Sequence, residues 1–88
     1  MKNTTIIEND IELTSPLQVL ELGNNQIISI PESICSLIKL QMLNLSDNKI
    51  TSIPESIELL INLQELYLYN NQINLIPKSI KNKSYLKL

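Results

Sequence analysis

The sequence predicts an α/β solenoid: a short array of repeated coils with a parallel sheet on the concave side and short helical or 3-10 turns on the convex side. The first observation is a 23-residue period of leucines, at Leu17, Leu40, Leu63 and Leu86. The second is that the segments between them agree wherever a side chain would be buried, over residues 17–39, 40–62 and 63–85. Such a period indicates units that bury their apolar side chains against their neighbours.

The strand of each coil is predicted where leucine alternates with variable residues. When the first residue of each repeat is position 1, leucine also holds positions 4 and 6, as Leu20 and Leu22, Leu43 and Leu45, and Leu66 and Leu68. A period of two describes a short strand with one buried face. The variable residues at positions 3, 5 and 7 are therefore expected to face outward from the concave side of the sheet.

An asparagine at position 9 follows each strand, as Asn25, Asn48 and Asn71. An amide side chain can bond both the backbone donors and the backbone acceptors that a tight turn leaves unpaired. Because the same residue recurs in every coil, the sequence predicts a structural ladder of asparagines along one edge of the array.

A proline at position 15 marks the start of each returning segment, as Pro31, Pro54 and Pro77. Proline is tolerated in the first turn of a helix, whose N–H groups have no helical partner. Glu32 and Glu55 follow two of the prolines, where a helix start favours negative charge. The sequence therefore predicts short helical or 3-10 turns on the convex side.

The two ends depart from the repeat. Residues 1–16 are expected to form a partial N-terminal coil or cap, because Ile7 and Ile11 fall on the register of the later isoleucines. At the other end, Lys83 and Ser84 replace apolar residues of the earlier repeats and make the last returning segment polar. Residues 86–88 are expected to start a fourth coil that lacks its own leucines at positions 4 and 6.

The pattern LxxLxLxxNxIxxIPxxI, which recurs three times, resembles that of the leucine-rich repeat family. The resemblance is closest to the 23-residue intracellular subtype seen in Ras-scaffold proteins and in the plant Ras-group repeat proteins. It covers residues 17–82 well and residues 4–16 loosely, and it rests on eight defined positions. It implies a curved solenoid that binds other proteins, with the partner contacts on the concave sheet.

The candidate partner-binding residues occupy positions 3, 5, 7 and 8, and they are Val19, Glu21, Met42, Asn44, Asp47, Glu65, Tyr67 and Tyr69. Tyr67 and Tyr69 are the strongest candidates, because exposed tyrosines offer a large contact area at little cost in rotamer entropy. The acidic residues among them would suit a partner that bears lysine or arginine. The alternative is that these residues are ordinary for exposed strands.

Composition argues against catalysis and against several classes of ligand. There is no histidine, Cys35 is the single cysteine and Gly23 the single glycine, so no catalytic site, phosphate loop, metal site or cofactor is expected. Lysines without arginine make nucleic acid a poor candidate partner, and no stretch reaches the ~20 apolar residues of a membrane span. A lone cysteine and the lack of a signal-peptide pattern favour a cytoplasmic location.

The sequence thus predicts a non-catalytic protein–protein interaction module, or scaffold, that binds through its concave face. One alternative is a fragment or regulatory repeat segment of a larger multidomain signalling protein, such as a kinase or ubiquitin ligase. Another is an accessory repeat protein without a dedicated partner. Because the concave face is small, self-association through the C-terminal edge is a further expectation.

Overall fold

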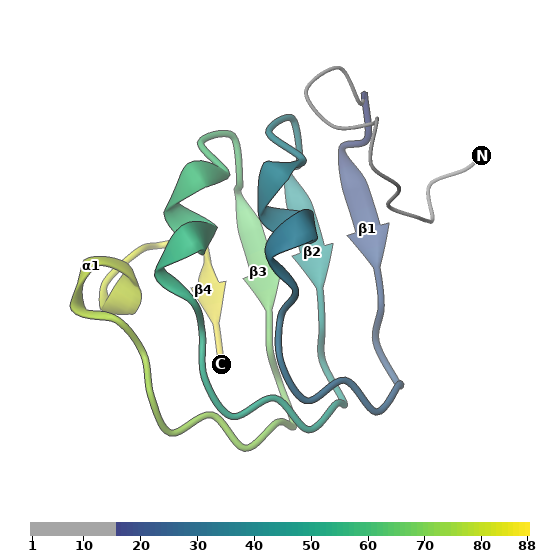
Figure 1. The fold of residues 1–88 in the computed structure, drawn as a ribbon, viewed down its shortest axis with the longest axis vertical. Helices are drawn as coiled ribbons and strands as arrows, with labels where there is room; N and C mark the ends of the chain where they lie inside the picture. The colour runs from purple at the N-terminus through teal and green to yellow at the C-terminus, as the bar shows by residue number, and fades with distance from the viewer. Residues whose placement is uncertain (1–15) are drawn as a thin grey trace.

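The computed structural model describes residues 16–88, which wind as successive coils (Figure 1). One parallel sheet contains, in spatial order, β1 (Val19–Glu21), β2 (Met42–Asn44), β3 (Glu65–Tyr67) and β4 (Leu86–Lys87). The returning segments are two 3-10 helices and one α-helical turn, η1 (Glu32–Ser36), η2 (Glu55–Leu59) and α1 (Lys78–Lys81). The predicted α/β solenoid is confirmed. The predicted N-terminal coil, with Ile7 and Ile11, lies outside the described residues except for Pro16.

Strands β1, β2 and β3 each bury only their middle residue, and these residues stack across the sheet. Leu20 lies opposite Leu43, and Leu43 lies opposite Leu66. Leu43 and Leu66 are fully buried, whereas the residues on either side of them in the strand remain partly exposed. A single coil therefore has no core of its own, and its apolar residues leave water only when a neighbouring coil covers them.

The convex turns have the conformation that their prolines allow. Pro31 and Pro54 both have extended backbone, with φ of −69° and −75°, and immediately precede the 3-10 helices. In the first coil, the N–H of Ile34 donates to the carbonyl of Pro31 at 3.1 Å. The N–H of Leu37 then donates to the carbonyl of Ile34, also at 3.1 Å. These three-residue steps direct Ile34 and Leu37 into the core and return the chain to the sheet.

The C-terminal strand differs from the prediction in its register. Leu86 lies opposite Leu66, so it occupies position 4 and not position 1. The N–H of Leu68 donates to the carbonyl of Lys87 at 2.9 Å, which places Leu88 at position 6. The expectation that residues 86–88 lack leucines at these positions is therefore wrong.

The polar residues of the last returning segment account for this shorter path. Lys83 and Ser84 are exposed, whereas Leu60, at the place of Lys83, is buried. The N–H of Leu86 still donates to the carbonyl of Lys83 at 3.2 Å, as the N–H of Leu63 does to Leu60 in the preceding coil. After Ile80, the last residue of this segment that is buried, the chain pairs with β3 directly after that turn.

Replacing a buried leucine of the middle coil should remove most of the array's stability. Leu43→Ala is expected to lower the free energy of unfolding by roughly 2–5 kcal/mol, because it leaves a cavity between two neighbouring strands. The matched control is Leu59→Ala in the same coil, since Leu59 is 60% exposed, and it should change stability by less than about 0.5 kcal/mol. Urea denaturation followed by circular dichroism measures both values, and equal losses would contradict the assigned core.

Candidate protein-binding surface

The parallel register aligns the outward side chains of the sheet in columns. Val19, Met42 and Glu65 form the position 3 column. The position 5 column contains, from β1 to β4, Glu21, Asn44, Tyr67 and Lys87. Neighbouring members are about 4.8 Å apart, the spacing of paired strands. Residues distant in sequence thus form one continuous face. These two columns, together with Asp47 and Tyr69, are here called the concave surface.

Asn44 connects two strands of the concave surface. Its Nδ2 donates to Oε1 of Glu21 on β1 at 2.9 Å. Its Oδ1 accepts a hydrogen bond from the N–H of Ser46 at 3.0 Å. Because both ends of the amide are engaged within the protein, Asn44 holds the Glu21 carboxylate in place.

Tyr67 and Tyr69 form an aromatic pair at one end of the concave surface. Their ring centroids are 6.0 Å apart and the rings are tilted by 44°. Tyr69 is 46% exposed, and Tyr67 is half-buried. The N–H of Tyr69 donates to Oγ of the buried Ser46 at 3.0 Å, which fixes the backbone that carries the second ring. The sequence predicts that Ser46, at position 7, faces outward, and this is wrong: Ser46 is buried, and its hydroxyl accepts the Tyr69 N–H.

The tyrosine pair lies in a negative environment. The pKa of Tyr67 is raised first by loss of hydration, then by the charge of Glu65 and by a hydrogen bond to that carboxylate. Tyr69 and Glu21 raise it further. Negative charge opposes ionisation of a phenol, so Glu65 and, more weakly, Glu21 add to the effect of lost hydration on the Tyr67 phenol.

Lys87 joins the concave surface although the sequence did not point to it. It lies opposite Tyr67 because β4 enters the sheet three residues earlier than the 23-residue period predicts. The signal that could have revealed this is the spacing of Leu86 and Leu88, which are two residues apart like the leucines at positions 4 and 6. A residue between two such leucines faces outward.

Asp47 has a conformational role in addition to its place at the rim. It has φ of 59°, and Asn24 and Asn70 at the same position of their coils have φ of 57°. Asparagine and aspartate tolerate this left-handed region better than other residues with side chains. Nδ2 of Asn70 also donates to Oδ1 of Asp47 at 2.9 Å. The recurrence of Asn, Asp and Asn at position 8 was the sequence signal for this turn.

The position 9 asparagines satisfy the turns beside the concave surface. Oδ1 of Asn48 accepts a hydrogen bond from the N–H of Ile27 in the previous coil at 3.0 Å. Nδ2 of Asn48 donates to the carbonyls of Leu22, Leu45 and Ser46 at 3.0–3.2 Å. Asn48 is buried, and its bonds join two coils through groups that are partly or fully buried.

Of the other two asparagines, Asn71 repeats the hydrogen bonds of Asn48, and Asn25 repeats only those within its own coil. Oδ1 of Asn71 accepts from the N–H of Ile50 at 2.8 Å, and its Nδ2 donates to Leu45 at 2.9 Å. Asn25 is exposed, and its Nδ2 donates within its own coil, to the carbonyls of Leu22 and Gly23. Within residues 16–88, the position 9 side chains that bond across coils are those of Asn48 and Asn71.

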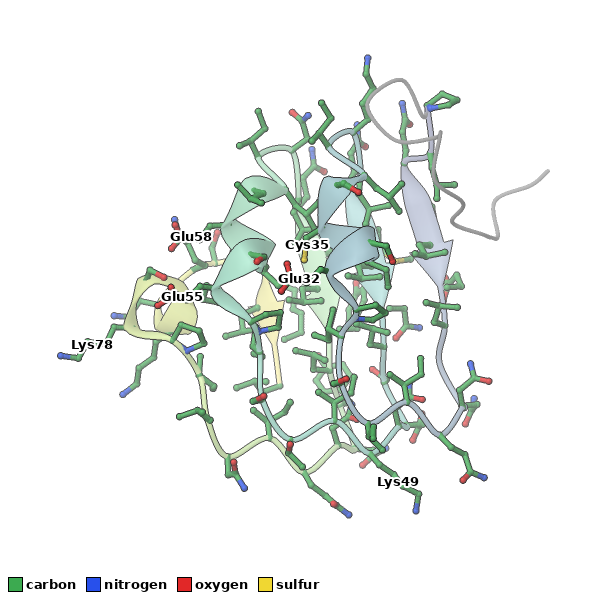
Figure 2. The ribbon with its side chains drawn as sticks, in the orientation of Figure 1. Glu32, Cys35, Lys49, Glu55, Glu58 and Lys78 are labelled. Carbon is green, nitrogen blue, oxygen red and sulfur yellow. The ribbon has the colours of Figure 1, made fainter. Side chains whose placement is uncertain are left out.

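The convex side presents a shallow groove between η2 and α1. Its lining consists of Glu55, Ser56, Glu58, Leu59 and Ser79. Glu55 and Glu58 are near α1 in Figure 2, and Lys78 extends from that helix.

Among residues 16–88 no cluster of histidine, cysteine and acidic side chains could hold a metal ion. In the same part of the chain, no helix is long and apolar enough to cross a membrane.

Cys35 belongs to the core rather than to a reactive site. It is 2% exposed, and Figure 2 shows it on η1, between η1 and η2. Burial, and secondarily the charge of Glu32, raises its thiol pKa to about 11. Because the thiolate is the nucleophilic form, this environment suppresses its reactivity.

A comparison with protein families now identifies the repeat. A family model described as Leucine rich repeat matches residues 15–73. The chain belongs to the leucine-rich repeat family. Leucine-rich repeat domains generally mediate protein–protein interaction and are typically non-enzymatic. No curated protein matches the chain significantly.

Removing the buried asparagine should destabilise the array more than removing its exposed counterpart. Asn48→Ala is expected to lower the free energy of unfolding by ~1–3 kcal/mol, because it orphans buried backbone groups of two coils. Asn25→Ala should cost less than about 1 kcal/mol, because water can reach the groups that it releases. Chemical denaturation of the two variants compares them directly. An Asn25→Ala loss as large as that of Asn48→Ala would contradict the proposed role of burial.

The raised pKa of Tyr67 should depend on Glu65. The neutral phenol is favoured in the folded state, so its contribution to stability is present below about pH 10 and is lost as pH rises through the raised pKa. Glu65→Gln removes the neighbouring charge and should lower the pKa of Tyr67 measured from its ring carbon signals by NMR. The pKa of Tyr85, raised by burial and by Glu58, serves as an internal control and should stay unchanged.

Proposed function

We propose that this leucine-rich repeat chain is a non-catalytic module that binds a partner protein through its concave surface. The observation that carries the proposal is the Tyr67–Tyr69 pair, in which Tyr67 is half-buried and Tyr69 is 46% exposed, on a sheet whose neighbouring backbone is fixed by the Ser46 hydrogen bond. Aromatic residues held in one geometry lose little entropy on binding, which is why they are enriched at interaction hot spots. Met42 and Val19 add apolar area along the same face, and Val19 is 39% exposed.

The size of the concave surface favours weak or transient binding. Strands of three residues, about 4.8 Å apart, project only a few hundred Å², whereas a standard interface uses about 800 Å² per partner. A partner would therefore either dissociate readily or extend its contacts beyond the sheet. This behaviour suits a scaffold or a signalling role better than a permanent complex.

We also propose that the chain is of the 23-residue intracellular subtype and acts in the cytoplasm. The support is the spacing of the first three repeats and a single cysteine that is buried as a free thiol. Free buried cysteines are compatible with a reducing compartment, where disulfides are rare.

Site-directed photocrosslinking tests which face binds. A photoreactive benzoylphenylalanine replaces Met42 on the concave surface or, as a matched control, Ser56 on the convex side; both native residues are half-buried. In extract from the source cells, the Met42 variant should crosslink one specific protein that the Ser56 variant does not capture. Tyr67→Ala combined with Tyr69→Ala should reduce that capture.

Two outcomes would contradict the proposal. Capture from Ser56 alone would assign binding to the convex side, and unchanged capture in the double alanine variant would remove the tyrosines from the interface. Circular dichroism of each variant establishes that it is folded before capture. Crosslinks between two copies of the chain would instead indicate self-association.

A further inference from the structure

We infer that the tyrosine pair and Glu65 form a subsite for an arginine side chain of the partner protein. This inference rests on the proposed function and specifies the chemistry that the concave surface recognises. Three features support it: the open aromatic rings, an adjacent carboxylate with acceptor capacity to spare, and the charge balance of the surrounding side chains.

The aromatic rings provide the first contact. The rings of Tyr67 and Tyr69 are 6.0 Å apart and inclined by 44°, so they present two different faces to an incoming group. The face of an aromatic ring carries negative electrostatic potential and attracts a cation placed over it. A guanidinium group is planar and weakly hydrated, and it can stack on such a ring, which a compact ammonium group does less well.

Glu65 provides the second contact. A carboxylate has about four acceptor positions, so Glu65 retains acceptors beyond its interaction with the Tyr67 hydroxyl. The other two acids of the concave surface already accept side-chain amides, Glu21 from Asn44 and Asp47 from Asn70. Glu65 is therefore the acid best placed to receive the paired N–H groups of a guanidinium that lies against the tyrosine rings.

The surrounding charges favour a cation and set a limit on its position. Glu21, Asp47 and Glu65 give the concave surface three negative charges, against one positive charge from Lys87. Lys87 lies directly opposite Tyr67 on the neighbouring strand. It repels a cation approaching from β4, so an arginine would enter from the side of Glu65. Replacing Lys87 with a neutral residue should therefore strengthen binding.

A titration with one isolated side chain tests this inference without knowledge of the partner. The probe is N-acetyl-arginine amide, and the matched control is N-acetyl-citrulline amide, which has nearly the same shape without the charge. The chain has three tyrosines and no tryptophan, so ring signals in NMR spectra report on Tyr67, Tyr69 and Tyr85 separately. The arginine probe should shift the signals of Tyr67 and Tyr69 saturably and leave Tyr85 unmoved.

Variants of the two contacts sharpen the test. Glu65→Gln should weaken binding of the arginine probe by about fivefold, because it removes a charge-assisted hydrogen-bond pair. Tyr69→Phe keeps the ring and should retain binding, whereas Tyr69→Leu should lose it. Lys87→Gln should tighten binding by about twofold.

Equal shifts with the citrulline probe, or an unchanged affinity in Glu65→Gln, would overturn the inference. A lysine probe that binds as tightly as arginine would overturn the preference for guanidinium. The proposed function has a separate readout. Partner capture from Met42 with no arginine response would overturn this inference and leave the proposed function in place, whereas loss of that capture would remove the proposed function itself.

Discussion

The structure depends on the contact between leucines of successive coils at position 4. A strand of three residues buries only its central side chain, so it gains almost nothing from its own neighbours in sequence. Leu20, Leu43 and Leu66 become buried because they lie side by side in the sheet. The apolar area that stabilises each coil is therefore contributed jointly with the next coil, and the stability of the array belongs to the interfaces between its coils.

The same arrangement explains why a binding surface can form on so small a chain. Side chains at positions 4 and 6 pack in the core, and residues at positions 8 and 9 form the turns. Most side chains at positions 3, 5 and 7 therefore contribute little to the fold. Asn44 and Ser46 are the exceptions, since they link strands and fix the backbone of Tyr69. Between these supports the sheet presents two tyrosines and Glu65, and loss of hydration together with the charge of Glu65 raises the pKa of Tyr67.

Much of the fold could be predicted because it depends on residue type at fixed spacing. Alternating leucines predicted the strands, and the recurring prolines predicted the convex turns. The register of β4 could not be obtained from the 23-residue period. Leu86 keeps the turn hydrogen bond of a position 1 leucine, but it pairs with Leu66 as a position 4 leucine does. That difference kept Lys87 out of the predicted surface. The left-handed conformation at position 8 had a sequence signal in the recurring Asn, Asp and Asn, whereas the burial of Ser46 depends on one hydrogen bond, which leaves little pattern.

The separation of core residues from outward-facing residues within each strand has an evolutionary consequence. The residues that specify the fold and those that would contact a ligand alternate along the strand and point to opposite sides, as Leu66 and Tyr67 do. A substitution at an outward position can therefore alter recognition while the aliphatic spine stays intact. A lineage carrying such a chain could acquire new binding preferences by single changes, without first passing through unfolded intermediates.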